Sequence, residues 1–442
     1  MAAEAGHGEA RPSEREIRRA VAGAAMGNAV EWYDYAIYSY LVTSIGLNFF
    51  PEADPTAQKL LVFAGIALPF VLRPLGSFVL GPLGDKFGRR AVLAFTIITM
   101  SGATLCVGLI PSFATIGVAA PVLLVAARLV QGFSTGGEYG GAATFIAEYA
   151  PDRRRGLLGS FLELGTLSGY VLGAGIATTM QLTLPPQALN GWGWRIPFLL
   201  AGPIGLVGFY LRQKLDDSPS FRRLASKGAG TKAPLREALS YWPQILNLIG
   251  IVILLNVADY TLLTYMPTYL TRVLNINEAQ SLLVLVGVML AMIAFITPLG
   301  ALSDRIGRRP VLLASAIGFL LFSYPAISLI EMRSAFAVSG GLLILAVLLP
   351  LMLATIGSTL PAMFPTRNRY GAFSLGYGVS TALFGGTAPL VITALIASTG
   401  SNSIPAFYLM AAAAIAIVPI CLMPETSRRS ISHPTRIPGT NP

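Results

Sequence analysis

The chain has 442 residues, of which 54% are hydrophobic and only 12% are charged. An ordinary soluble domain carries about 25% charged residues, so this composition excludes that class. Apolar runs of about 20 residues recur along the whole length, which is typical of transmembrane helices. The net charge of +10 does not indicate a nucleic-acid partner, because the basic residues occupy short segments between apolar runs and form no continuous face.

The cysteines and histidines exclude several kinds of site. Cys106 and Cys421 both lie within apolar runs, so we expect neither a disulfide framework nor a bound metal. His7 and His433 lie in polar terminal segments, so no histidine is placed to relay protons inside a membrane. Residues 1–19 are polar and of mixed charge, without a cleavage-site pattern, so we expect no removable signal peptide.

The apolar runs predict an all-α membrane protein with twelve transmembrane helices in two six-helix halves. The expected helices lie near 20–48, 57–82, 91–111, 117–147, 157–180, 195–213, 243–269, 279–301, 311–330, 335–363, 372–397 and 404–423. We divide the chain into an N-terminal segment (1–19), an N-terminal bundle (20–213), a linker (214–242), a C-terminal bundle (243–423) and a tail (424–442).

Basic residues predict the orientation of these helices. Lys and Arg are concentrated in the two termini, the linker and alternate loops, whereas the opposite loops hold only Lys59, Arg195, Arg272 and Arg333. Cytoplasmic loops of membrane proteins carry an excess of Lys and Arg. We therefore expect a multi-pass protein of the cell membrane with both termini in the cytoplasm.

One sequence motif occurs twice, 219 residues apart. The pattern G-x-L-x-D-[KR]-x-G-R-R spans residues 81–90 and again 300–309, each time in a predicted short loop between two apolar runs. Its glycines permit a tight turn and close helix approach, and its aspartate can pair with an arginine or meet a helix N-terminus. The candidate gating residues are Gly81, Gly84, Asp85, Gly88, Arg89, Gly300, Asp304, Gly307 and Arg308.

The repeated motif resembles the signature of the major facilitator superfamily. The stretches 27–34, 73–76, 128–139 and 193–198 narrow the similarity to its metabolite:proton symporter family, over residues 20–425. This resemblance implies the major facilitator fold and alternating access to a site near the membrane midplane. It also implies that the motif latches the cytoplasmic side; the alternative is a basic turn with no gating role.

Three further stretches, 147–153, 263–270 and 358–366, resemble the proline/glycine betaine carriers of that family. The acidic Glu163 adds to this similarity, because the similar betaine carriers have Asp there and the organic-acid carriers usually have a neutral amide. One departure concerns the segment after Glu425, which contains several prolines and no heptad pattern. A long C-terminal coiled coil is therefore not expected here.

Seven charged residues lie inside the predicted helices and away from the helix ends, where charges are costly and usually pair or face a cavity. Glu31 and Asp34 are three residues apart and share a helix face, so each should disfavour ionisation of the other. We predict that Asp34, Glu31 and Glu138 couple transport to protons, although each could instead hold helices together through an arginine. The other charged residues are Arg73, Arg128, Glu163 and Asp259.

Aromatic residues accompany these charges in the first and seventh helices. Aromatic faces beside a carboxylate suit a quaternary ammonium group through cation–π attraction. The alternative for any one of them is packing or an interfacial belt. The candidate substrate-binding residues are Trp32, Tyr38, Arg73, Arg128, Glu163, Tyr260 and Tyr265.

These observations predict a secondary transporter that imports a small zwitterion such as proline or glycine betaine together with protons. A proton symporter for an organic acid is the main alternative, followed by a drug:proton antiporter and a membrane sensor. The sequence has no nucleotide-binding loop and no Ser/His/Asp set, so we expect no enzyme. We expect protons as the coupling ion with no cofactor, a solute and membrane lipids as partners, and function as a monomer.

Overall fold

The computed structural model describes residues 12–53, 55–214, 216–226, 233–427 and 430–431. These residues form helices and connecting segments and contain no strand. The long helices of the first half are α1 (Glu14–Tyr40), α3 (Pro55–Phe87), α4 (Arg89–Leu109), α6 (Ala119–Tyr149), α7 (Arg155–Thr183) and α9 (Arg195–Gln213). Those of the second half are α12 (Trp242–Asp259), α14 (Glu278–Ile306), α15 (Arg308–Glu331), α16 (Ala335–Thr359), α17 (Arg369–Ser380), α18 (Ala388–Thr399) and α19 (Ile404–Leu422).

Short helices connect the long ones. They are α2 (Val42–Phe49), α5 (Phe113–Ile116), α8 (Pro186–Ala188), α10 (Pro219–Ser226), α11 (Pro234–Leu239) and α13 (Met266–Thr268). The 3₁₀ segments are η1 (Asp152–Arg154) and η5 (Pro361–Met363). The π-helical segments are η2 (Leu189–Gly193), η3 (Tyr260–Tyr265), η4 (Tyr269–Val273) and η6 (Thr381–Gly385).

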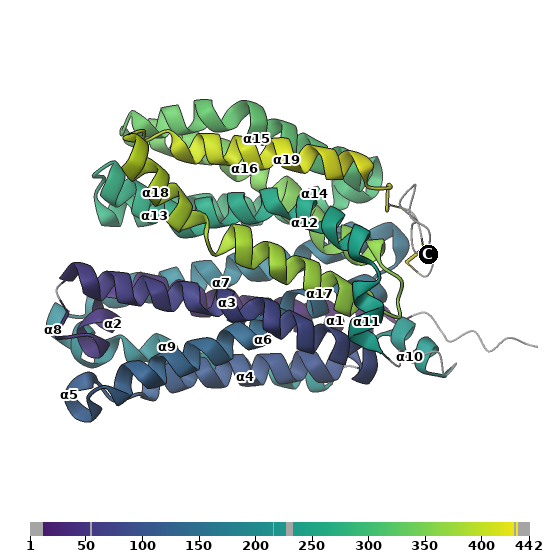
Figure 1. The fold of residues 1–442 in the computed structure, drawn as a ribbon, viewed down its shortest axis with the longest axis horizontal. Helices are drawn as coiled ribbons and strands as arrows, with labels where there is room; N and C mark the ends of the chain where they lie inside the picture. The colour runs from purple at the N-terminus through teal and green to yellow at the C-terminus, as the bar shows by residue number, and fades with distance from the viewer. Residues whose placement is uncertain (1–11, 54, 215, 227–232, 428–429, 432–442) are drawn as a thin grey trace, which may run out of the picture.

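The two halves form two bundles that lie one above the other with their helices running side by side (Figure 1). Helices α7, α3 and α6 of the first bundle contact α14, α16 and α17 of the second. We call the end that holds α10 and α11 the terminal end, and the end that holds α2, α5 and α8 the distal end (right and left in Figure 1). The interface between the bundles therefore extends between these two ends.

Eleven helical spans among the described residues are long and apolar enough to cross a membrane. The remaining long helix, α1, is more polar because it begins with charged residues and carries Asn28, Glu31 and Asp34. Contacts with α6, α7 and α9 bury these side chains, so α1 is an interior helix of the bundle. The predicted all-α fold with twelve long spans is confirmed.

Three predicted helices are interrupted. The first ends at Tyr40, and α2 begins after Leu41. The seventh changes to the π-helical η3 after Asp259, and the eleventh changes to η6 after Ser380. Pro267 and Pro389 follow these two segments and lack the backbone N–H that would bond four residues back within η3 and η6.

The repeated motif is not a loop in either copy. Gly88 alone separates α3 from α4, and Gly307 alone separates α14 from α15. Their φ angles are +106° and +104°, in the region that favours glycine. The expected loop is wrong because one glycine in this conformation reverses the chain, which leaves the other motif residues helical.

Candidate functional site

Asp34 on α1 is bonded to two side chains of α6. Its Oδ2 lies 2.7 Å from Arg128 Nη1, and its Oδ1 accepts a hydrogen bond of 2.8 Å from Gln131 Nε2. Arg128 also donates through Nε to the Gly65 carbonyl at 3.0 Å and lies 4.2 Å from the centre of the Tyr38 ring. Both charged side chains are buried, so the pair neutralises itself inside the protein.

Glu31 on α1 forms an ion pair with Arg73 on α3. Both side chains are buried. The second terminal nitrogen of Arg73, Nη1, lies 3.4 Å from the hydroxyl of Tyr260 in the other bundle. Arg73 therefore connects a carboxylate of the first half to an aromatic residue of the second.

The sequence predicted that Glu31 and Asp34 would act on each other. Each carboxylate instead has its own arginine, Arg73 or Arg128, on a different helix. Because a nearby cation stabilises an ionised carboxylate, mutual repulsion is not the main electrostatic feature of either group. Their proposed role in proton coupling stays a prediction.

Glu138 on α6 is bonded to Arg212 on α9, whose Nη1 lies 3.1 Å from Glu138 Oε2. The Thr96 hydroxyl also donates to this carboxylate, and Arg212 Nε donates to the Gly23 carbonyl at 3.1 Å. The structure buries Arg212 at the end of α9. Glu138 therefore holds three helices of the first bundle together, and its role in coupling stays a prediction.

Glu163 on α7 and Asp259 at the end of α12 differ from the carboxylates above. Glu163 accepts hydrogen bonds from the Tyr139 hydroxyl at 2.5 Å and the Thr166 hydroxyl at 2.9 Å. Asp259 is 4% exposed, and its Oδ1 has no hydrogen-bond partner in the described part of the chain. No arginine or lysine forms an ion pair with either group among those residues.

Aromatic rings from both bundles meet next to Asp259, which directly precedes Tyr260. Trp32 on α1 stacks on Tyr170 of α7 with 5.1 Å between ring centres, and its ring lies 5.9 Å from that of Tyr260. Tyr170 also shares a hydrogen bond of 3.2 Å with Thr264 of the second bundle. We call Trp32, Tyr170 and Tyr260 the aromatic cluster.

Two of the candidate tyrosines lie outside the aromatic cluster. Tyr38 covers the Arg128 guanidinium. Tyr265 lies at the end of η3 and faces Tyr269, at 6.2 Å between ring centres. The structure adds a pair that the sequence analysis did not single out, Tyr139 and Tyr377, whose rings stack at 4.1 Å across the interface. Tyr139 donates a hydrogen bond to Glu163, and Tyr377 stacks on Tyr139.

The two motif aspartates make equivalent contacts at the terminal end. Asp85 accepts hydrogen bonds from the backbone N–H groups of Tyr370 and Gly371, at 3.2 and 2.7 Å, at the start of α17. Asp304 accepts from those of Gly156 and Leu157, at 2.7 and 2.9 Å, at the start of α7. Each aspartate thus binds the positive end of a helix in the opposite bundle. We call these two contacts the latch.

The remaining motif residues support the latch. Arg89 lies 3.2 Å from Asp85, and Arg308 lies 3.7 Å from Asp304. The glycines allow close approach, since a side chain at Gly84 would collide with Tyr370 and one at Gly300 with Ser160. Gly81 lies close to Gly371 and Ser374 in the same way. The structure thus brings both copies of the motif to the interface at the terminal end.

Sequence reasoning missed a carboxylate at the centre of this end. Glu148 at the end of α6 lies 2.6 Å from Arg369 and 3.4 Å from Arg89, and it accepts a hydrogen bond from Ser218. Arg369 begins α17, so the group joins the two bundles. Glu148 occurs in the stretch 147–153 quoted for its family resemblance, but nothing in its spacing indicated a partner 221 residues away.

Two further carboxylates cap the helices that follow the motif. Asp217 accepts from the backbone N–H groups of Arg89 and Arg90, and burial raises the pKa of its carboxyl. Glu425 accepts from those of Arg308 and Arg309, both at 3.0 Å. Burial acts to raise the pKa of Glu425, but the backbone donors Arg308, Ser427 and Arg309 outweigh it and hold the pKa below its usual value.

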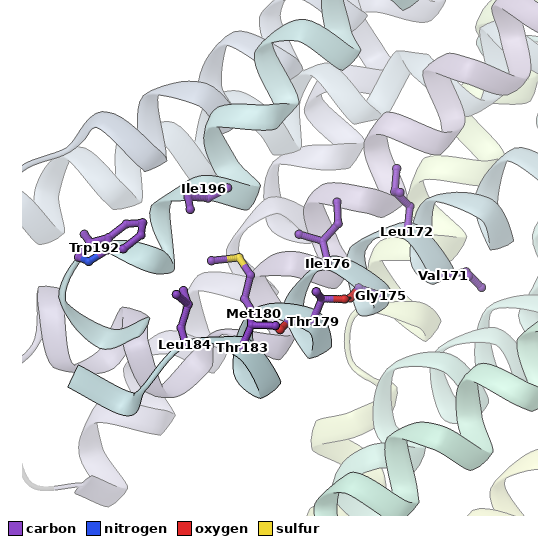
Figure 2. A pocket seen from close by; sticks show the side chains of 10 residues that line it. All are labelled: Val171, Leu172, Gly175, Ile176, Thr179, Met180, Thr183, Leu184, Trp192 and Ile196. Atoms are coloured by element: carbon purple, nitrogen blue, oxygen red, sulfur yellow. Dashed lines mark hydrogen bonds between the residues drawn. The ribbon is translucent and has the colours of Figure 1, made fainter. Parts of the chain in front are cut away.

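A separate recess of about 510 Å³ lies along the distal half of α7, next to η2 and the start of α9 (Figure 2). Its lining is apolar except for Thr179 and Thr183, whose hydroxyls donate to carbonyls of their own helix. It contains none of the charged residues described above, so it offers nothing to orient a charged solute.

Comparison with known proteins places this architecture in a family. Residues 20–238 match the model of sugar (and other) transporters, and residues 248–440 match that of the major facilitator superfamily. The proline/betaine transporter of Salmonella typhimurium is 42% identical over 431 residues, which cover 95% of this chain and 86% of that protein. The chain belongs to the major facilitator superfamily, in the family of the proline/betaine transporters.

A second relative is OusA of Dickeya dadantii, a glycine betaine/proline/ectoine/pipecolic acid transporter. It is 42% identical over 430 residues, which cover 95% of this chain and 85% of OusA. Among solved structures, the proton:xylose symporter XylE has a TM-score of 0.77 at 17% identity, covering 95% and 98% of the two chains. The human organic anion transporter MFSD10 has a TM-score of 0.66 at 16% identity, covering 92% and 99%. These two likenesses concern the fold.

Proposed function

We propose that this transporter imports a small zwitterion of the proline or glycine betaine type together with protons. The observation that carries the proposal is the aromatic cluster, formed by both bundles, next to Asp259, a buried carboxylate without an arginine partner in the described part of the chain. Cation–π attraction and a nearby carboxylate suit a positively charged ammonium group. The names of the relatives support the same class of solute.

Arg73 is the group that would bind the carboxylate of such a solute. Its Nη1 faces Tyr260 at the aromatic cluster, while its other terminal nitrogen, Nη2, is bound to Glu31. The solute would then lie between the bundles, where alternating access requires it. Opening of the latch would expose this site to the terminal end.

An uptake screen in proteoliposomes tests the solute class. The screen compares proline, glycine betaine and ectoine with citrate, shikimate and 2-oxoglutarate, under an inward proton gradient. We expect accumulation of the first three, with acidification of the interior that depends on added solute. A protonophore dissipates the proton gradient and should abolish the accumulation. Accumulation of only the organic acids would favour the alternative symporter, and accumulation with sodium alone would exclude proton coupling.

Trp32→Ala should weaken the binding of glycine betaine more than that of proline, because only betaine carries a quaternary ammonium group. A cation–π contact is worth about 0.5–2 kcal/mol, so we expect the KM for betaine to rise roughly 2- to 30-fold. Trp32→Phe keeps a ring and is the matched control, with a smaller rise. An equal change in KM for both solutes would count against the aromatic recognition of betaine.

The terminal end is proposed to face the cytoplasm. Lys86 and Arg305 are exposed there, and Ala114 is exposed at the distal end. In a protein whose two native cysteines are replaced by serine, Ala114→Cys should react with an impermeant thiol reagent on intact cells. Lys86→Cys and Arg305→Cys should react only after the membrane is permeabilised. The reverse pattern would invert the orientation.

A further inference from the structure

Carboxylates in the interior of the bundles fall into two groups. Most of them are bound to arginine, as with Glu31, Asp34 and Glu138. Glu163 and Asp259 form no ion pair among the described residues, although they are only 2% and 4% exposed. Burying an unpaired charge is costly, and burial in a membrane removes the nearby water that could offset the cost. These two carboxylates therefore need another source of neutralisation.

The two groups come from opposite bundles and lie at the same interface. Glu163 accepts a hydrogen bond from Tyr139, whose ring stacks on Tyr377 of the second bundle. Asp259 directly precedes Tyr260, whose ring centre lies 5.9 Å from that of Trp32 in the first bundle. Glu163 has its hydrogen-bond donors, Tyr139 and Thr166, on its own bundle, and Asp259 Oδ1 has none in the described chain. The titratable and charged groups that act on Asp259 or respond to it are Glu163, Arg73, Tyr139, Tyr170, Tyr260 and Tyr377. Arg73 is the one cation in this set, and Glu31 already binds it.

Two buried carboxylates at one interface, neither ion-paired with an arginine among the described residues, are costly to ionise together, and one bound proton would remove much of that cost. Asp259 is also the last α-helical residue before η3, and π-helical segments often occur at functional sites. Movement of the bundles would change the separation of the two carboxylates and their access to water. The affinity of the pair for a proton would change with it.

We propose that Asp259 and Glu163 together hold the coupling proton, which Asp259 Oδ1 carries in the closed protein. This inference rests on the proposed function. The O–H bond forms with a proton from the distal side, and it breaks when the terminal end opens and the proton passes to water there. After solute and proton have been released, Arg73 is the cation that can neutralise ionised Asp259 while the empty protein returns to the state that is open on the distal side.

The test uses glycine betaine in proteoliposomes with four variants. Asp259→Asn and Glu163→Gln remove negative charge near the proposed ammonium site, so every measurement uses saturating betaine and is divided by the counterflow of the same variant, which needs no net proton movement. The ratio of uphill uptake to counterflow should fall at least tenfold in both variants, and betaine-dependent internal acidification should fall with it. Asp259→Glu keeps a titratable group and should retain uphill uptake. Glu331→Gln on α15, outside the proposed site, is the matched control and should behave like the parent.

Two results would overturn the inference. One is uphill uptake by Asp259→Asn at the parent's level. The other concerns the infrared band of a protonated carboxyl group, measured in acid and in alkaline buffer. We expect this band in the purified parent and its loss in purified Asp259→Asn. An unchanged band in the variant would overturn the inference. The infrared measurement needs no solute. Failure of the parent to exchange betaine would therefore refute the proposed function, whereas the infrared measurement would still test the proton site.

Discussion

Asp34→Asn is expected to destabilise the folded protein strongly, because it leaves the buried Arg128 without its anionic partner. Breaking a buried ion pair from one side costs about 3–5 kcal/mol. The thermal unfolding midpoint of the purified protein should fall, and less protein should be inserted into the membrane. Asp34→Glu keeps the charge and should lose less stability.

The double variant Asp34→Asn, Arg128→Gln separates structural from transport roles. Removing both charges takes away the uncompensated arginine, so we expect the double variant to recover most of the lost stability. If the folded double variant exchanges solute but does not accumulate it, Asp34 has the coupling role predicted from the sequence. If the double variant is as unstable as Asp34→Asn, the unpaired charge of Arg128 is not the cause of the lost stability.

Glu148→Gln is expected to open the terminal end. Glu148 is the shared partner of Arg89 and Arg369, which are both buried and lie in different bundles. If the closed state loses about 3 kcal/mol, the ratio of open to closed protein rises about 100-fold, because each 1.4 kcal/mol is a factor of about ten.

Thiol reactivity measures this opening. Ser374 is buried where α17 meets Gly81 and Gly140, so Ser374→Cys should be protected in the parent and reactive after Glu148→Gln. Ser315 lies inside the second bundle, where its hydroxyl donates to the Leu348 carbonyl, so Ser315→Cys should stay protected in both proteins. Equal protection of Ser374→Cys in the two proteins would show that Glu148 does not hold the terminal end closed.

The sequence was informative where a pattern is local. Long apolar runs predicted the helices, and the repeated motif identified Asp85 and Asp304. Local pattern could not reveal that Arg212 folds back onto Glu138, or that Glu148 meets Arg369 from the other half, because such pairs depend on helix packing. It also could not distinguish Asp34 from Asp259. Both are acidic residues in apolar runs, and only the packed structure shows which of them has an arginine beside it.

The latch has an unusual consequence for how this protein can vary. Asp85 and Asp304 bind backbone N–H groups, so on the receiving helix only a substitution by proline, which lacks the N–H, can remove their partner. Side chains there can only obstruct it: a Cβ at Gly156 would lie 2.4 Å from Ser303 Oγ, and one at Gly371 would lie 3.0 Å from Asp85 Oδ2. Mutation can therefore adjust the strength of this closure gradually from the aspartate side, whereas on the receiving side the available changes are mostly disruptive.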